Sequence, residues 1–102
     1  MAGAVPASAG STGVQARCPA TLNPVVNGGE AAWTIDCVGS KVHITGWVKD
    51  TKADGLCAFV KAFASFTDGS SRKEAKACPK GTTTRFAWEA TGTEITAYLY
   101  LA

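Results

Sequence analysis

The chain has 102 residues, enough for one domain with a modest core. Its 10 Lys and Arg against 8 Asp and Glu leave a formal net charge of +2, so we expect no nucleic-acid partner, which would need basic residues clustered on one face. The sequence contains no apolar run of about 18 residues, so we expect no transmembrane helix.

The N-terminus has the small residues of a secretory signal peptide at its cleavage end. Ala7-Ser8-Ala9 before Gly10 is the small-x-small pattern that a signal peptidase cuts. The charged and long apolar parts of such a signal are missing, so we interpret Met1–Ala9 as a remnant; the alternative is an ordinary Ala/Gly/Ser leader. We predict that Ser11–Arg17 is flexible, that residues 18–102 form the single domain, and that the protein is secreted and extracellular.

Four cysteines in a short, apparently exported chain indicate two disulfides. Of the three possible connectivities we favour the sequential one, Cys18–Cys37 and Cys57–Cys78. Each bond would close a loop of about 20 residues, worth roughly 3 kcal/mol in the chain-entropy model. The sequence has no closely spaced CxxC pair, so we predict no zinc site, no redox-active pair and no cofactor.

Alternating apolar and polar residues predict strands in the first half of the domain. A short edge strand is expected around residues 22–26, followed by longer strands at Ala31–Cys37 and Lys41–Lys49. Gly46 stands on the inward row of the last strand, where it indicates a bulge or close packing against an aromatic ring. The other residues of that row are apolar, namely Val42, Ile44 and Val48.

The second half predicts a polar hairpin loop at Asp50–Gly55 and then four more strands. Ala, Lys and Glu make a helix the rival for the first two of these strands, but the flanking turns and the aromatic residues favour strands. The second, which is charged, is expected at a sheet edge. The predicted fold is therefore all-β, a small antiparallel sandwich or barrel of about six strands. The four strands are Leu56–Thr67, Arg72–Cys78, Thr82–Glu89 and, after a turn at residues 90–93, Glu94–Leu101.

The sequence predicts no enzyme and no metal site. His43 is the only histidine, and no serine stands in a nucleophile-elbow context, so we interpret His43 as a surface residue. The loop Asp50–Gly55 has Asp and Gly at calcium-loop positions, but Lys52 and Lys61 stand where oxygen ligands are needed. A solvated Asp-Gly hairpin turn is the better interpretation.

Several aromatic residues fall on strand faces that the predicted core does not need. Grouped on a sheet, they would form a recognition surface that stacks on sugar rings or anchors a protein. The alternative is that a two-layer fold buries one set, while the stems of Lys49 and Lys61 cover the other. The candidate binding residues are Trp47, Phe59, Phe63, Tyr98 and Tyr100.

The segment from Cys37 to Cys57 resembles the tendamistat family of small actinobacterial α-amylase inhibitors. In both, an alternating strand passes through an acidic, Thr-containing turn into Gly-Leu-Cys, here Gly55-Leu56-Cys57; the turn from Pro79 to Thr83 and the closing AYLYLA are weaker similarities. The resemblance implies a six-stranded β-sandwich with two disulfides. It does not extend to the inhibitory Trp-Arg-Tyr triplet, because Ala32-Trp33-Thr34 stands between the first two cysteines, nor to a last cysteine near the C-terminus.

We therefore expect a secreted, non-enzymatic protein that recognises another macromolecule, either as an inhibitor or as an adaptor subunit of an exported complex such as a toxin complex. The expected partner is a secreted protein or a glycan, and the chain would be a monomer or a subunit of a hetero-complex. The segment Gly10–Arg17 could add to a partner as a strand. The alternative is a stand-alone antimicrobial or toxin-like effector, against which the mild charge argues.

Overall fold

Every regular element in the computed structural model, which describes residues 11–102, is a β-strand. The all-β prediction is confirmed, and the helical alternative for the segments after residues 56 and 72 is wrong. No helix in the described part of the chain is long and apolar enough to cross a membrane. The strands are β1 (Ser11–Arg17), β2 (Ala20–Leu22), β3 (Val25–Val26), β4 (Gly29–Val38), β5 (Lys41–Asp50), β6 (Ala58–Phe66), β7 (Arg72–Ala77) and β8 (Thr83–Leu101).

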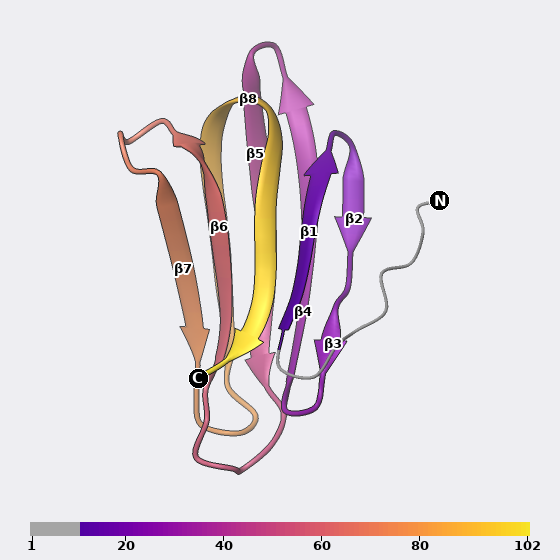
Figure 1. Cartoon of the computed structure of the whole chain (residues 1–102), viewed down its shortest axis with the longest axis vertical. Helices are drawn as coiled ribbons and strands as arrows, with labels where there is room; N and C mark the ends of the chain where they lie inside the picture. Colours follow the sequence, from indigo (N-terminus) through magenta and orange to yellow (C-terminus); the bar gives the residue numbers. More distant parts are fainter. Residues whose placement is uncertain (1–10) are drawn as a thin grey trace.

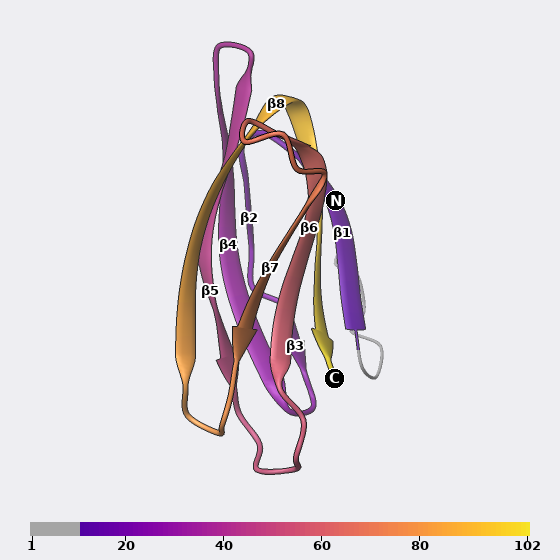
Figure 2. The same cartoon turned by 90° about the vertical axis from the view of Figure 1, so that its left-hand side faces the viewer.

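One continuous antiparallel sheet in the order β2-β4-β5-β8-β6-β7 folds over into two layers, with β1 paired to β8 and β3 to β4 (Figure 1). The first half of β8 pairs with β5, and its second half pairs with β6 and with β1. Figure 2 shows the two layers edge-on, with β4 and β5 on one side and β6 and β1 on the other. β8 bends from the first layer into the second.

The core lies between the layers and is built from alternate residues of each long strand. Along β5 the inward residues are Val42, Ile44 and Val48, as the alternation predicts. The second layer contributes small and branched residues from three strands, so the two inner faces approach closely. These are Ala58, Val60 and Ala62 of β6, Ala75 and Ala77 of β7, and Ile95, Ala97 and Leu99 of β8.

β8 corrects the prediction of two strands separated by a turn at residues 90–93. The chain passes through this region as one strand. Gly92 has a φ of 107°, a conformation that L-residues with a Cβ rarely adopt. Before it, Ala90 is buried; after it, Ile95 is buried, so the inward row changes from even to odd positions. The expected turn residues thus bend the strand and switch its inward side, and do not end it.

The N-terminal segment also differs from the prediction. The sequence predicts that Ser11–Arg17 is flexible, but this segment forms β1 and pairs with the second half of β8 from Ser11↔Tyr100 to Arg17↔Glu94. This strand satisfies the edge of β8 that β6 leaves unpaired. The predicted signal remnant at residues 1–9, like Gly10, lies outside the described residues.

Both disulfides form with the predicted connectivity, Cys18–Cys37 and Cys57–Cys78. The first has a Cα–Cα distance of 5.5 Å and joins the segment before β2 to β4. The second has a Cα–Cα distance of 5.0 Å and joins the open ends of the β6–β7 hairpin. Two disulfides are compatible with an extracellular protein.

Gly46 marks the closest approach between β4 and β5. It pairs with Trp33, whose side chain is buried with 1% exposure. A Cβ on Gly46 would lie 2.0 Å from the carbonyl oxygen of Ala32 and 2.9 Å from Cβ of Trp33. The prediction of close packing against an aromatic residue is confirmed, and the clash is with backbone, which cannot rotate away.

We therefore expect Gly46→Ala to lower the free energy of unfolding by about 3 kcal/mol, because β4 and β5 must separate to admit the methyl group. Urea unfolding followed by tryptophan fluorescence measures this. Gly39→Ala is the matched control: its φ is 61° and a Cβ added there would meet no atom within 4 Å, so it should cost only about 1 kcal/mol from backbone strain. Equal losses for the two variants would contradict the steric account.

Candidate binding surface

Four of the predicted binding residues lie together on the outer face of the second layer. Phe59 and Phe63 come from β6, and Tyr98 and Tyr100 come from β8, all at positions that alternate with the buried row. The register brings Phe59 opposite Tyr100 and Lys61 opposite Tyr98. We call these five residues, Phe59, Lys61, Phe63, Tyr98 and Tyr100, the aromatic face.

The rings of the aromatic face pack against one another. Phe59 and Tyr100 are stacked, with centroids 5.0 Å apart and planes 11° from parallel. Phe63 and Tyr98 meet edge to face, with centroids 6.0 Å apart and planes 77° from parallel. Both arrangements are favourable for aromatic quadrupoles and contribute about 0.5–1.5 kcal/mol per pair beyond area burial. The four side chains are therefore ordered before any partner arrives.

Two lysines lie near ring faces of the stacked pair. The Nζ of Lys61 is 4.8 Å from the centroid of Tyr100, and the Nζ of Lys76 is 6.0 Å from that of Phe59. Such cation–π contacts contribute about 0.5–1 kcal/mol at exposed sites. The alternative interpretation of Lys61 is thus confirmed in part, because this lysine does cover an aromatic ring, whereas Phe63 remains 40% exposed.

The hydroxyl of Tyr100 donates a hydrogen bond to the carboxylate of Glu74 on β7. Burial, together with this bond and the negative charge of Glu74, raises the pKa of Tyr100 to about 12. The bond ties β7 to β8 across β6. It also keeps the phenol protonated at neutral pH, so that Tyr100 adds no negative charge to the aromatic face.

Positive charge surrounds the rings. Arg72, Glu74 and Lys76 stand on the outer face of β7, opposite Phe63, Lys61 and Phe59 respectively. With Lys61 this makes three cations and one carboxylate, and that carboxylate is engaged by Tyr100. Beside the rings, an open hollow of about 300 Å³ is lined by Lys61, Phe63, Tyr98 and Tyr100.

Trp47, the fifth predicted residue, is not part of this group. It lies on the outer face of β5, paired with Ala32 and Arg85, and β5 belongs to the other layer (Figure 2). Its neighbours around a separate, shallow hollow are Lys49, Thr83 and Arg85. Alternation correctly places Trp47 outward, but it carries no information on which layer a strand joins.

The charged residues of β7 are not among the predicted binding residues. From the sequence, Arg72, Glu74 and Lys76 indicate only an edge that discourages aggregation. Their role beside the rings follows from the β6–β7 register, since Phe59 pairs with Lys76 and Lys61 with Glu74. The hairpin turn at residues 68–71 contains the signal, because a short turn brings residues of one parity on both strands to the same face.

The remaining candidates for chemistry are held in local interactions. The Nε2 of His43 lies 3.3 Å from the carboxylate of Glu89, and both side chains are 41% exposed, as expected for a surface histidine. In the loop after β5, Asp54 accepts a hydrogen bond from the Leu56 amide, which is turn chemistry. Within residues 11–102, no three His, Cys, Asp or Glu side chains are grouped to hold a metal ion.

No protein-family model, no curated protein and no solved structure matches this chain. The resemblance to the tendamistat family therefore stays a prediction, and the site is interpreted from its own geometry.

The Tyr100–Glu74 contact predicts a late phenol titration. Of the two tyrosines, Tyr100 should ionise with a pKa of about 12, seen as a late rise in phenolate absorbance. Because this pKa lies above the unfolded value of about 10, its contribution to stability is present below pH ~10 and is lost as the pH rises through about 12.

Three variants check the assignment of that titration. Tyr100→Phe should abolish the late step, and Tyr98→Phe should keep it. Glu74→Gln should lower the pKa of Tyr100, because the amide carries no charge to oppose the phenolate. A late step that survives in Tyr100→Phe would show that this hydroxyl does not make the contact.

Proposed function

We propose that this chain is a secreted, non-enzymatic binding protein, an inhibitor or adaptor, whose aromatic face docks an apolar, acidic segment of a partner protein. The observation that carries the proposal is a cluster of four mutually packed rings on the outer face of a sheet, with cations around it. An outer sheet face needs no such cluster for the core, and ordered aromatic residues beside cations are typical of interface hot spots.

Ring geometry favours a protein partner over a glycan. A sugar stacks on a free ring face, but Phe59 and Tyr100 face each other, and Lys76 and Lys61 lie over these rings. The more accessible pair, Phe63 and Tyr98, meets edge to face. The hollow beside that pair suits an inserted apolar side chain, because it offers ring edges and a lysine stem for contact.

Charge favours an acidic partner over a second copy of this chain. Lys61, Arg72 and Lys76 outnumber the single carboxylate of Glu74, which already accepts the Tyr100 hydroxyl. Two such faces brought together would place like charges opposite each other, which disfavours an isologous dimer. Carboxylates flanking an apolar anchor would meet the cations and speed association.

The non-enzymatic and secreted parts of the proposal rest on other observations. The one histidine of the chain pairs with the carboxylate of Glu89, an arrangement that supplies no nucleophile. All four cysteines are in disulfides, which form and persist in oxidising compartments.

Selection of random displayed peptides on the oxidised protein tests this proposal. We expect enriched sequences that combine a large apolar residue with Asp or Glu. Their affinity, measured by calorimetry, should fall about 30-fold, or about 2 kcal/mol, in Phe63→Ala and in Tyr98→Ala, because each substitution removes an anchor of the hollow. Affinity should also fall with added salt.

Trp47→Ala is the matched control, since it removes an outward aromatic residue from the other layer and should leave the affinity unchanged. Far-UV circular dichroism of each variant verifies folding. Selected peptides that bind Phe63→Ala and Tyr98→Ala as tightly as the parent would overturn the proposal. So would binding to a glycan array with no peptide enriched.

A further inference from the structure

A second hollow, of about 420 Å³, lies beside the Cys57–Cys78 disulfide, between the loop after β5 and the turn before β8. Its walls are mainly apolar and come from Ala53, Leu56, Pro79 and the disulfide. One carboxylate and two lysines also line it, namely Asp50, Lys52 and Lys80. This hollow is separate from the aromatic face, with which it shares no residue.

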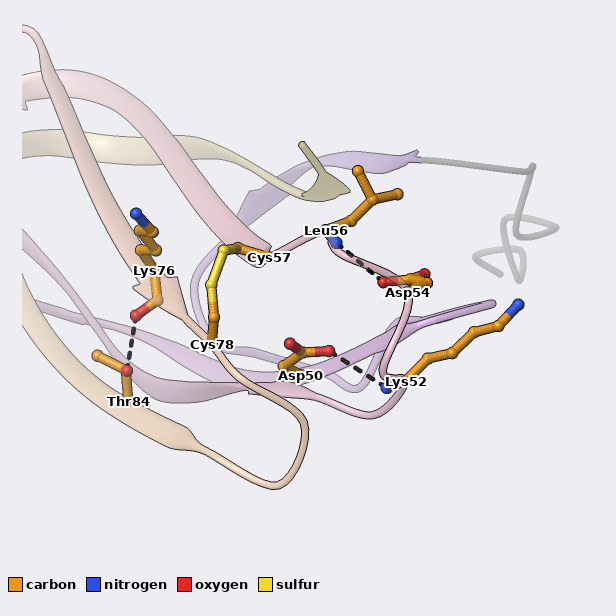
Figure 3. The surroundings of a disulfide bond; sticks show 8 residues. All are labelled: Asp50, Lys52, Asp54, Leu56, Cys57, Lys76, Cys78 and Thr84. Atoms are coloured by element: carbon orange, nitrogen blue, oxygen red, sulfur yellow. Dashed lines mark hydrogen bonds between the residues drawn. A yellow bond between two sulfur atoms is a disulfide. The ribbon is translucent and has the colours of Figure 1, made fainter.

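Asp50 is the one buried charged residue in the described part of the chain, with 2% exposure. Figure 3 shows its side chain pointing from β5 into the space between the loop of Lys52 and Asp54 and the segment of Cys78. The Oδ1 atom accepts a hydrogen bond from the Lys52 amide at 3.2 Å. No donor from residues 11–102 reaches Oδ2, so this atom has unused acceptor capacity beside the hollow.

The backbone holds this carboxylate in place. The Asp50 N–H donates to the carbonyl of Thr82 at 3.1 Å, and the Gly81 N–H donates to the carbonyl of Asp50 at 2.7 Å. The loop is tied at both ends, because the Thr51 N–H donates to Gly28 and Cys57 pairs with Ala102 in both directions. The hollow is thus built before any ligand enters, which lowers the entropy lost on binding.

The charges select the ligand. A buried carboxylate with a free acceptor position is unfavourable until it receives a donor, and an ammonium group is the strongest match. A simple cation, however, would meet the exposed Lys52 and Lys80 on the same hollow, and a simple anion would meet Asp50. A molecule with an ammonium group at one end, an apolar stem and a carboxylate at the other avoids both conflicts.

We propose that this hollow binds an ω-amino carboxylate, with the ammonium group on Asp50, the stem against Leu56 and Pro79, and the carboxylate on Lys52 or Lys80. The same chemistry occurs in a free ω-amino acid and in the C-terminal lysine of a peptide. Such an end would reach the hollow from outside, since Lys52, Lys80 and Leu56 are exposed at its rim.

Titration with ε-aminocaproate, followed by backbone amide shifts in NMR spectra, tests the proposal. Shifts should concentrate at Lys52, Gly55 and Lys80, with a dissociation constant on the order of 1 mM. Hexylammonium and hexanoate each lack one charged end and should bind at least tenfold more weakly. Hexanoate that binds as well as ε-aminocaproate, or shifts that spare the hollow, would overturn the assignment.

Asp50→Asn is the decisive variant, because its side-chain oxygen can still accept the Lys52 amide while the charge is lost. We expect at least tenfold weaker binding of ε-aminocaproate. Asp36→Asn, which removes the same charge from the exposed face of β4, is the control and should bind normally. An unchanged affinity in Asp50→Asn would refute the role of the buried carboxylate.

Two peptides distinguish the sources of the ligand. A short peptide ending in lysine and its amidated form differ only in the terminal carboxylate. Binding of the acid but not of the amide would assign the hollow to protein C-termini. Binding of ε-aminocaproate alone would assign it to free ω-amino acids. Binding of neither ε-aminocaproate nor the acid peptide would overturn the proposal without touching the aromatic face, since Asp50→Asn leaves that surface intact.

Discussion

The backbone ladders of β8 are the constraint on which the rest of the structure depends. This strand hydrogen-bonds to β5 along its first half and to β6 and β1 along its second half. Ala90 belongs to two ladders at once, opposite Val42 and opposite Phe66. Because a ladder fixes both position and register, the two layers cannot slide past each other without breaking β8.

The change of inward row at Gly92 makes this arrangement possible. A strand with strict alternation that passed from one layer to the other would turn its apolar row outward in one of them. Gly92, with its positive φ, shifts the alternation so that Ala90 and Ile95 both point to the core. The same shift puts Tyr98 and Tyr100 on the outer face of the second layer, so the aromatic face is a consequence of the bend.

Local patterns are sufficient to predict most strands, the inward row of β5 and the disulfide pairs, because alternation and loop length act over short distances. They fail where pairing partners decide. The residues around Gly92 have turn chemistry, yet the chain stays in the sheet. Alternation predicts that an aromatic residue points outward, but only the register shows that Phe59 stacks on Tyr100 and that Trp47 belongs to the other layer. The Asp-Gly pattern after β5 likewise predicts a turn, but it contains no sign that the turn before β8 closes over this loop and buries Asp50.

The order of the aromatic face distinguishes a binding surface from an accidental one. Isolated exposed rings would bury area on binding but would first have to give up their rotational freedom, which costs about 0.5–1.5 kcal/mol per side chain. Here the stack of Phe59 on Tyr100, the two lysines and the bond to Glu74 have already removed that freedom. Because Tyr100 uses its hydroxyl on Glu74, it also presents no unsatisfied donor that a partner would have to match. The gain on docking therefore comes from Phe63, Tyr98 and the surrounding cations, which are the groups left free to contact a partner.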